Sequence, residues 1–445
     1  MAGGCFFDSP ITNSIGNSYL ILPLRAASNN LKGSIPNELQ LLSKLSFLSL
    51  KHNNITGSIP PFLGELTSMN YLDLKYNLLT GSLPSTLADL QLLQVLGLSH
   101  NRLEGSLPEW MGNLFSLQTL AIDRNFFIGD IAPVGFLTNL RYLYADNNLL
   151  EGRLDAGLLE NMIELIELDL SGNFLRSTAI PDYIFSFSPH LKIMDLSENV
   201  LSGTFPPNIL PNTVLEYFSL RLNQVSGSIP PSIVNLAQLS HLDLEGNPLT
   251  GRMPSVLGSM QHMTYLFLGG NKFWTGPIPG EYQALTNLRE LSLDSSGLIG
   301  SIPSWITKFT SLKLLDLHKN SLTGSLPSGL LNLSNLTFLL LSDNKLSGPL
   351  PENVSSVTEL AVVTLHSNNF TGSAAPFCMV DHPLNLLTID CRNVTCPCCN
   401  TCCSSSDCYA DVTWNLLESS QNSWEEHFIR TDYSFNPHIL SPSST

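Results

Sequence analysis

The sequence has few charged residues, and those it has are mostly acidic. Only 13% of the 445 residues are Asp, Glu, Lys or Arg, whereas about a quarter is usual in soluble globular domains. There are 37 acidic and 21 basic residues, which gives a formal net charge of −16. This balance argues against nucleic acid or an anionic membrane surface as a partner, because both are negatively charged. A simpler interpretation is that the acidity keeps a large exposed surface soluble.

Targeting, membrane-spanning and catalytic signals are also missing. Residues 1–18 lack the basic start and apolar run of a signal peptide, and no run of about 18 apolar residues could span a bilayer. The sequence contains no HExxH, GxSxG, GxxxxGK[ST] or GxGxxG motif. His52, His100 and His318 stand at unlike positions and predict no catalytic triad. We therefore predict a protein that is not an enzyme and uses no cofactor and no metal.

Cysteine is almost absent before residue 378 and dense after it. Cys5 stands alone, and the other eight cysteines fall within 31 residues: Cys378, Cys391, Cys396, Cys398, Cys399, Cys402, Cys403 and Cys408. An even, dense cluster of this kind favours a disulfide-bonded cap formed in an oxidising compartment. The pairing stays open, with Cys378–Cys391 as one candidate. The alternative is a thiolate metal site, but zinc sites usually need a second ligand pair well separated in sequence.

The chain is dominated by one repeated unit, of which residues 92–114 are a clear example. Leu96 and Leu98 alternate with Gly97 and Ser99, as the two faces of a strand do. After Asn101, Gly105 and Pro108 favour a turn. The Asn recurs at fifteen matching positions, mostly at intervals of 24 residues, and Ser replaces it once: Asn29, Asn53, Asn77, Asn101, Asn125, Asn148, Asn173, Asn199, Asn223, Asn247, Asn271, Ser296, Asn320, Asn344 and Asn368.

This pattern resembles the plant-type leucine-rich repeat, LxxLxLxxNxLxGxIP, and the period lies in the range of that class. The resemblance implies a repeat solenoid of the α/β class. Such a solenoid is a curved right-handed superhelix with a parallel β-sheet on its concave face and turns or 3-10 segments on its convex face. We expect four regions: an N-terminal remnant without a recognisable cap (1–18), fifteen repeats (19–377), the cysteine-rich cap (378–408) and a polar tail (409–445). The cap resembles the ends of algal, especially diatom, leucine-rich repeat proteins.

The asparagine column is predicted to be scaffold and not a binding site. Its amide both donates to and accepts from backbone groups that the inward turn buries. Ser296 offers one short hydroxyl, so its repeat should be locally weaker. An uncovered core at the amino end is unusual because terminal repeats normally need a cap. We therefore expect an upstream part that held the cap and a targeting or anchoring segment.

The concave face of the middle repeats carries the predicted ligand site. The regular spacing breaks between Asn125 and Asn199, and irregular loops in solenoids often lie on the functional face. Aromatic and charged residues are predicted to lie side by side on this face and to bind ligand: Tyr142, Tyr144, Glu167, Tyr217, Arg221, Tyr265 and Phe267. Asp residues of the Leu-Asp-Leu pattern, such as Asp169 and Asp195, are instead interpreted as scaffold.

Six N-x-S/T sequons add weight to a secretory route: Asn54, Asn332, Asn335, Asn353, Asn369 and Asn393. We predict a non-catalytic, extracellular or cell-surface recognition protein that binds a protein, peptide or glycan. The resemblance implies a receptor-like ectodomain. Two alternatives are a secreted inhibitor of a cell-wall-degrading enzyme, like the polygalacturonase-inhibiting proteins, and a structural or ice-binding wall protein. The last would need a flat face of repeated Thr or Ser.

Overall fold

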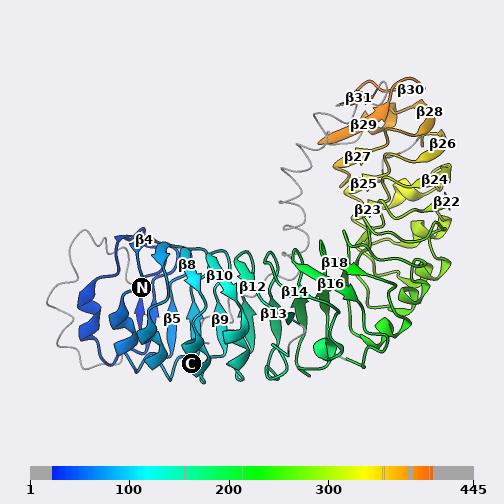
Figure 1. Ribbon diagram of the computed structural model, residues 1–445. Coiled ribbons are helices and arrows are strands. Elements are labelled where there is room, and N and C mark those ends of the chain that lie inside the picture. Colours follow the sequence, from blue (N-terminus) through cyan, green and yellow to red (C-terminus); the bar gives the residue numbers. More distant parts are fainter. Residues whose placement is uncertain are drawn as a thin grey trace. The chain divides into compact units, whose positions relative to one another are not determined.

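The computed structural model describes residues 23–154, 157–212, 214–352, 354, 356–378, 384–399 and 401–403. The predicted N-terminal remnant and polar tail lie outside these residues. The chain separates into two compact units, residues 1–250 and residues 251–445, and each is described by itself. The described elements are short β-strands and 3-10 helices (Figure 1). None of the helices in this part of the chain is long and apolar enough to cross a membrane.

The first unit is built on a parallel main sheet with one short strand from each repeat. Neighbouring repeats pair in strict register, as Leu72, Leu96 and Leu120 show by lying opposite one another. The strands are β1 (Leu24–Arg25), β3 (Phe47–Ser49), β5 (Tyr71–Asp73), β7 (Val95–Gly97), β9 (Thr119–Ala121), β11 (Tyr142–Tyr144), β13 (Glu167–Asp169), β15 (Ile193–Asp195), β17 (Tyr217–Ser219) and β19 (His241–Asp243). The strand positions predicted from the leucine spacing are confirmed.

A second set of strands follows the Asn turn in most repeats of the first unit, where the sequence analysis predicted turns only. It forms a six-stranded sheet and, later in the chain, a three-stranded one. The first comprises β2 (Lys32–Gly33), β4 (Asn54–Gly57), β6 (Leu78–Gly81), β8 (Arg102–Ser106), β10 (Phe126–Asp130) and β12 (Leu149–Glu151); the second comprises β14 (Arg176–Ser177), β16 (Val200–Thr204) and β18 (Gln224–Ser226). We call both the side sheets.

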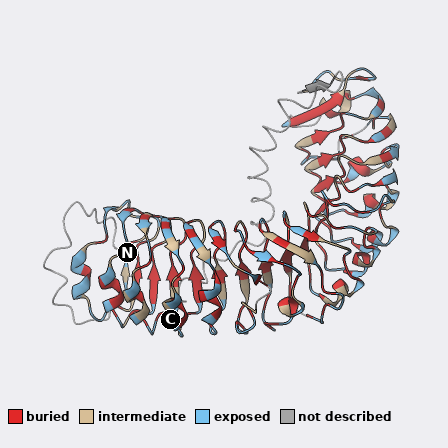
Figure 2. Cartoon of the chain, viewed as in Figure 1, coloured by how far each residue is buried: buried red, intermediate tan, exposed pale blue. Residues whose placement is uncertain are grey.

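Short 3-10 helices complete the repeats of the first unit. Most begin directly after the Pro of the repeat, whose fixed backbone angle suits the residue before a helical turn. They are η1 (Asn37–Leu41), η2 (Pro61–Glu65), η3 (Ser85–Asp89), η4 (Glu109–Asn113), η5 (Ala132–Phe136), η7 (Asp182–Phe185) and η8 (Pro231–Asn235). The core between these helices and the main sheet is a column of leucines, many of them fully buried (Figure 2).

The second unit repeats the same plan. Its main sheet contains β20 (Tyr265–Phe267), β21 (Glu290–Ser292), β23 (Leu314–Asp316), β25 (Phe338–Leu340), β27 (Val362–Thr364), β29 (Leu386–Asp390) and β31 (Thr401–Cys403). Its side sheet contains β22 (Ile299–Ser301), β24 (Ser321–Gly324), β26 (Lys345–Pro349), β28 (Asn369–Ser373) and β30 (Val394–Thr395). The 3-10 helices are η9 (Ser255–Ser259), η10 (Gly280–Ala284), η11 (Ser304–Lys308), η12 (Leu330–Asn332) and η13 (Ala375–Cys378).

The asparagine column forms the hydrogen-bond ladder that the sequence predicts. The Asn101 amide nitrogen donates to the carbonyl of Leu98 in its own repeat at 2.9 Å and to that of Leu74 in the preceding repeat at 3.0 Å. Its carbonyl oxygen accepts from the Leu79 amide at 3.0 Å. One side chain therefore satisfies buried backbone groups in two successive repeats.

Replacing Asn101 by Ala should lower the free energy of unfolding by about 1–3 kcal/mol, because these buried backbone groups would lose their partner. Denaturant midpoints measure the effect. Replacing the exposed Asn54, which lies in a side sheet, by Ala is the matched control and should change the midpoint little. An unchanged midpoint for Asn101→Ala would contradict the ladder.

Ser296 is a weak point in this column. Its hydroxyl lies 3.1 Å from the Leu268 carbonyl and 2.9 Å from the Asp294 carbonyl, but one hydroxyl hydrogen serves only one of them at a time. We expect Ser296→Asn to be neutral or to raise the unfolding midpoint of the second unit. A clear loss of stability would show that this buried position has no room for the amide.

The cysteine-rich segment contains disulfide bonds. Cys378 pairs with Cys398, and Cys396 pairs with Cys399; Cys391 is also disulfide-bonded. The candidate pair Cys378–Cys391 is therefore wrong, because chain path and not sequence distance sets which sulfurs meet. Five cysteines are thus unavailable as thiolate ligands. Cys408 and the side chains of Cys402 and Cys403 lie outside the described residues.

Candidate ligand-binding face

Each main sheet has one face on the leucine core and one face turned away from it, which we call the open face. In the first unit, strand register arranges its side chains in three rows that cross the repeats. The upstream row runs Phe47, Tyr71, Val95, Thr119, Tyr142, Glu167, Ile193, Tyr217, His241. The middle row runs Arg25, Ser49, Asp73, Gly97, Ala121, Tyr144, Asp169, Asp195, Ser219, Asp243. The downstream row runs Lys51, Lys75, Ser99, Asp123, Asp146, Ser171, Ser197, Arg221, Glu245.

Three of the seven predicted ligand-binding residues lie together on β11 and β13. Tyr142 and Tyr144 lie on one strand, and Tyr142 is directly opposite Glu167 on the next. All three are half-buried. The Tyr144 hydroxyl donates to Glu167 Oε2 at 2.7 Å. Burial raises the pKa of the Glu167 carboxyl, while this hydrogen bond and Lys192 oppose the rise. The cluster offers aromatic surface beside a carboxylate acceptor.

Tyr217 and Arg221 belong to the same unit but are packed more tightly than predicted. Tyr217 is only 6% exposed. Its hydroxyl donates to Asp195 Oδ2 at 3.1 Å, and its ring stacks on His241 with centroids 4.1 Å apart. An Arg221 guanidinium nitrogen lies 3.4 Å from Glu245 Oε1. Because the Tyr217 ring stacks on His241, a ligand would contact the edge of this ring and not that face.

Tyr265 and Phe267 lie on β20 in the second unit. They are 4% and 5% exposed and pack with Leu314 and Phe338 in a local cluster. The predicted set therefore divides into a half-buried group on β11 and β13, a packed group beyond it, and a pair in the other unit. Tyr217, Tyr265 and Phe267 are therefore part of the packing of the main sheets.

The hydrogen bonds of the middle-row aspartates support the interpretation of these residues as scaffold. Asp169 Oδ1 accepts from the Ser171 amide at 3.0 Å and from its hydroxyl at 2.6 Å. Asp195 makes the same pair of bonds to Ser197, at 2.9 and 2.6 Å. Each carboxylate thereby fixes the turn that ends its strand. Burial, together with the neighbouring Asp146 and Asp195, raises the pKa of Asp169 well above its ordinary value.

Sequence reasoning missed the first repeats, where cations and aromatic rings share the open face. The Arg25 guanidinium carbon lies 4.6 Å from the Phe47 ring centroid, and Phe47 stacks on Tyr71 at 4.1 Å. Lys51 Nζ is 3.9 Å from Asp73 Oδ2. These residues are readable from the sequence only by counting 24 residues from one repeat to the next.

A second missed group lies in the second unit. His318 Nδ1 is 2.6 Å from Asp316 Oδ1, and His318 Nε2 is 3.9 Å from Asp294 Oδ2. Burial alone would lower the pKa of His318, but the two carboxylates raise it. The three side chains offer ligand atoms within 4.8 Å of one another. An imidazolium held between two carboxylates satisfies this cluster by itself, so it does not demand a cation.

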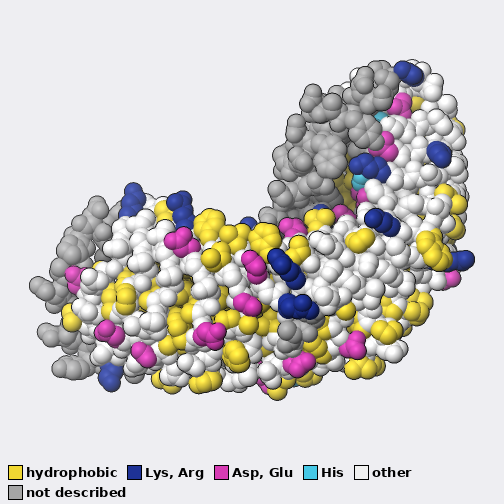
Figure 3. Space-filling view, viewed as in Figure 1, with side chains coloured by type: hydrophobic (Ala, Val, Ile, Leu, Met, Phe, Trp, Pro, Cys, Tyr) yellow, Lys and Arg dark blue, Asp and Glu magenta, His cyan; other side chains and the backbone are white. Residues whose placement is uncertain are grey.

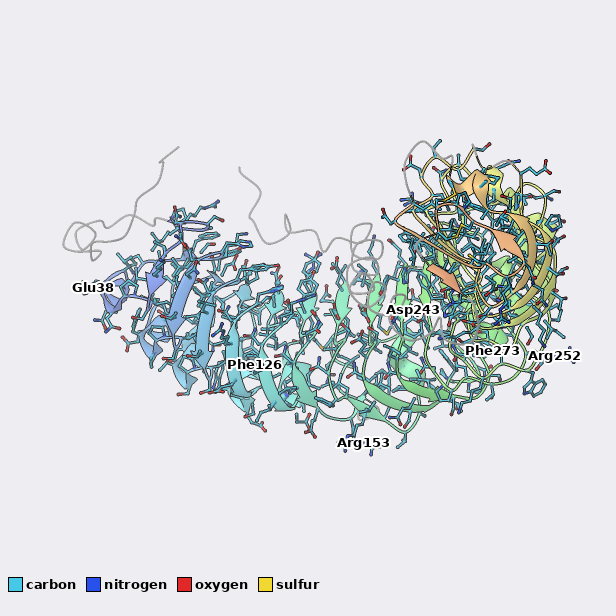
Figure 4. The ribbon with its side chains drawn as sticks, turned by 90° about the horizontal axis from the view of Figure 1, so that it is seen from above. Glu38, Phe126, Arg153, Asp243, Arg252 and Phe273 are labelled. Carbon is cyan, nitrogen blue, oxygen red and sulfur yellow. A yellow bond between two sulfur atoms is a disulfide. The ribbon has the colours of Figure 1, made fainter. Side chains whose placement is uncertain are left out.

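The outer surfaces of the repeats carry mixed charge and scattered apolar side chains. On the visible face of the first unit, acidic and basic side chains are interspersed (Figure 3). Arg153 is exposed and projects outward, whereas Asp243 is buried among neighbouring side chains (Figure 4). Five of the six sequon asparagines are described and exposed; Asn353 lies outside the described residues.

Comparisons with known proteins agree with this architecture. The leucine-rich repeat profiles match residues 44–66, 68–90, 92–114, 238–260 and 286–346. No curated protein sequence matches. The plant peptide hormone receptor RGFR1, solved in complex with RGF2, is similar with a TM-score of 0.71 and 33% identity over 82% of this chain and 58% of that chain.

Two further solved structures extend the comparison. The Arabidopsis receptor kinase HAESA, in complex with the peptide hormone IDA and the co-receptor SERK1, has a TM-score of 0.62 and 29% identity over 82% of this chain and 69% of that chain. The Leptospira interrogans protein LIC12759 has a TM-score of 0.58 and 28% identity over 78% and 90%. This chain spans a little over half of RGFR1. The present chain folds as a leucine-rich repeat solenoid, and the solved structures similar to it include ectodomains of plant receptors that bind peptides.

Proposed function

We propose that the protein is a non-catalytic recognition protein, of the receptor-ectodomain kind, whose open face in the first unit binds a peptide. The observation that carries this is the Tyr142–Tyr144–Glu167 cluster. Tyrosine presents a large contact area at low entropic cost and keeps a hydroxyl for hydrogen bonding. A carboxylate accepts from peptide amides or cationic side chains. The similar receptors RGFR1 and HAESA were solved with peptide ligands.

An extracellular or cell-surface location and glycosylation belong to the same proposal. The disulfides Cys378–Cys398 and Cys396–Cys399 are suited to an oxidising compartment. Asn54, Asn369 and Asn393 are exposed, as an N-glycosylation site requires.

The alternatives differ in what the open face should look like. An ice-binding face would repeat Thr or Ser, but the middle row passes from Tyr144 through Asp169 and Asp195 to Ser219 and Asp243. An inhibitor of a cell-wall-degrading enzyme would use a broad protein-binding surface and remains the second candidate. Its test is inhibition of a polygalacturonase by the purified chain.

The peptide-binding proposal predicts that Tyr142 is an anchor. Peptides selected from a random 12-residue display library against the purified protein should lose at least about 2 kcal/mol of binding free energy with Tyr142→Ala, the loss typical of a hot-spot aromatic. Isothermal titration calorimetry measures this loss.

Phe126→Ala is the matched control, because Phe126 is 54% exposed on β10 in the side sheet. Loss of binding with Phe126→Ala but not with Tyr142→Ala would place the site on the side sheet and not on the open face. If the library yields no binder that depends on the first unit, the peptide-binding function is wrong.

A further inference from the structure

The open face of the first unit separates positive from negative charge. Around β1, β3 and β5 the three rows contain Arg25, Lys51 and Lys75 but a single carboxylate, Asp73. Three positive charges and one negative charge leave a net of +2. This is notable in a chain with 37 acidic and 21 basic residues. A surface that only needed solubility would intersperse the two signs.

The positively charged end of the open face, around β1, β3 and β5, also carries stacked aromatic rings. Arg25 is exposed and lies over the Phe47 ring, which stacks on Tyr71 with an interplanar angle of 8°. Lys51 is partly exposed, and its Asp73 partner is almost fully buried at 1%. Burial, with Lys51 as a further cause, lowers the pKa of Lys75 although Asp73 and Asp123 oppose this. An entering anion would relieve the repulsion between these cations.

The rows over β9, β11, β13 and β15 have the opposite character. Their twelve positions hold five carboxylates and no Lys or Arg: Asp123, Asp146, Glu167, Asp169 and Asp195. The neighbours that bond these carboxylates include hydroxyls, such as Ser99 to Asp123 and Tyr217 to Asp195. Hydroxyl donors stabilise carboxylates without neutralising their charge. Asp123, at the edge of the group, keeps 15% of its side chain exposed.

Small side chains connect the two ends. On β7 and β9 the upstream and middle rows present Val95, Gly97, Thr119 and Ala121. A Cβ at Gly97 would lie 2.9 Å from Asp73 Oδ1, closer than such contacts occur. Asp73 and Lys75 therefore fill the space that a side chain at Gly97 would take, and a peptide backbone that crosses β7 and β9 would meet only small side chains in these two rows.

We propose that this face takes one extended peptide with its acidic residues or carboxyl terminus over Arg25, Lys51 and Lys75 and its basic residues over Asp123 and Glu167, the partly exposed carboxylates of this group that do not belong to the scaffold. The proposal rests on the peptide-binding function and specifies its ligand. From Lys51 on the β3 repeat to Asp146 on the β11 repeat there are four strand spacings, about 19 Å at about 4.8 Å each. An extended chain rises about 3.3 Å per residue, so opposite charges in the ligand should stand about six residues apart.

Proton release offers an independent readout. Burial and the nearby Asp146 raise the pKa of Asp123 to about 7. The other groups facing this carboxyl are the Ser99 hydroxyl, Lys75 and the His100 Nε2 at 3.8 Å. A peptide cation placed here would favour the ionised carboxyl. Binding near pH 6.5 should therefore release protons, which calorimetry detects as a dependence of the binding heat on the buffer.

The test uses two synthetic 12-residue Ser/Gly peptides of the same composition. In the spaced probe, the centres of a pair of Asp and a pair of Arg stand six residues apart. In the clustered probe, the four charges alternate in the middle. Fluorescence anisotropy at low salt should show at least tenfold tighter binding of the spaced probe, and only that probe should release protons. Equal affinities would overturn the inference.

Charge-reversal variants locate the effect. Lys51→Glu with Lys75→Glu, or Arg25→Glu alone at an exposed position, should weaken binding of the spaced probe at least tenfold. Lys32→Glu with Arg102→Glu changes the same charge at exposed positions of the side sheet, away from the three rows, and should leave binding within twofold. Unchanged affinity in both open-face variants would overturn the inference.

The library experiment distinguishes this failure from failure of the proposed function. Selected peptides that depend on Tyr142 but show no charge separation would leave peptide binding standing and overturn the charge-spacing inference. A library that yields no open-face binder would overturn peptide binding and, with it, this inference.

Discussion

Replacing Asp123 by Asn should raise the free energy of unfolding of the first unit at pH 7.5 and have little effect at pH 4. In the folded protein, burial and the neighbouring Asp146 raise the pKa of Asp123 to about 7. In the unfolded chain it is about 3.9. Between these values the folded state binds more protons than the unfolded state, so the contribution of Asp123 to stability falls as the pH rises from about 4 to about 7. The difference corresponds to at most about 4 kcal/mol.

His241, in the same unit, makes the opposite contribution, so the test compares the variant with the wild type and does not use the pH profile of the wild type alone. Burial lowers the pKa of His241 to about 3, whereas the unfolded value is about 6.5. Here the folded state binds fewer protons, so this contribution to stability rises with pH between about 3 and 6.5. The difference between wild type and Asp123→Asn cancels this effect because both retain His241.

Denaturant midpoints from pH 4 to pH 8, followed in the first unit, provide the measurement. Asp89→Asn is the matched control, because Asp89 is exposed at the end of η3 and should give nearly parallel curves. If Asp123→Asn is no more stable than wild type at pH 7.5, ionisation of the Asp123 carboxyl group does not destabilise the folded protein at that pH. The Ser99 bond would then be holding the carboxylate more strongly than burial disfavours it.

The strands and the asparagine ladder were predictable because both are coded within one repeat. Leu96-x-Leu98 places two leucines on one face of a strand, and the structure buries both completely. Asn101 could be assigned to backbone groups because its amide is the side chain that both donates and accepts. The side sheets were not predicted. Their short strands, such as Arg102–Ser106, form only because neighbouring repeats pair there, and no single repeat shows that pairing.

The candidate site was only partly predictable, for a related reason. Rows on the open face join residues about 24 positions apart, so Lys51 and Lys75 become neighbours only when successive repeats are aligned. The same alignment places Asp294 beside His318, which sequence reasoning treated as isolated. What alignment could not supply is burial. Tyr217 was predicted to face a ligand, but its contacts with Asp195 and His241 leave it almost fully packed.

The disulfide pairing could not have been predicted from the sequence. Cys378 ends η13, beside the buried Phe377, and Cys398 follows β30, which pairs with β28. The bond thus fastens the last described strands to the preceding repeat. It closes a loop with a sequence separation of 20, whereas Cys396–Cys399 spans only 3. Loop-closure entropy assigns about 3 kcal/mol to the first bond and about 2 kcal/mol to the second.

Replacing Cys378 and Cys398 together by Ser should therefore destabilise the end of the second unit by about 3 kcal/mol, and replacing Cys396 and Cys399 together should cost less. Because repeats contact only their neighbours, the loss should appear first at that end. Hydrogen exchange of the β29 and β30 amides is the direct measurement, with β21 amides as the internal control. Equal exchange in both double variants and the wild type would show that the repeats, and not the disulfides, hold this end closed. A greater effect from the Cys396–Cys399 pair would contradict the loop-length argument.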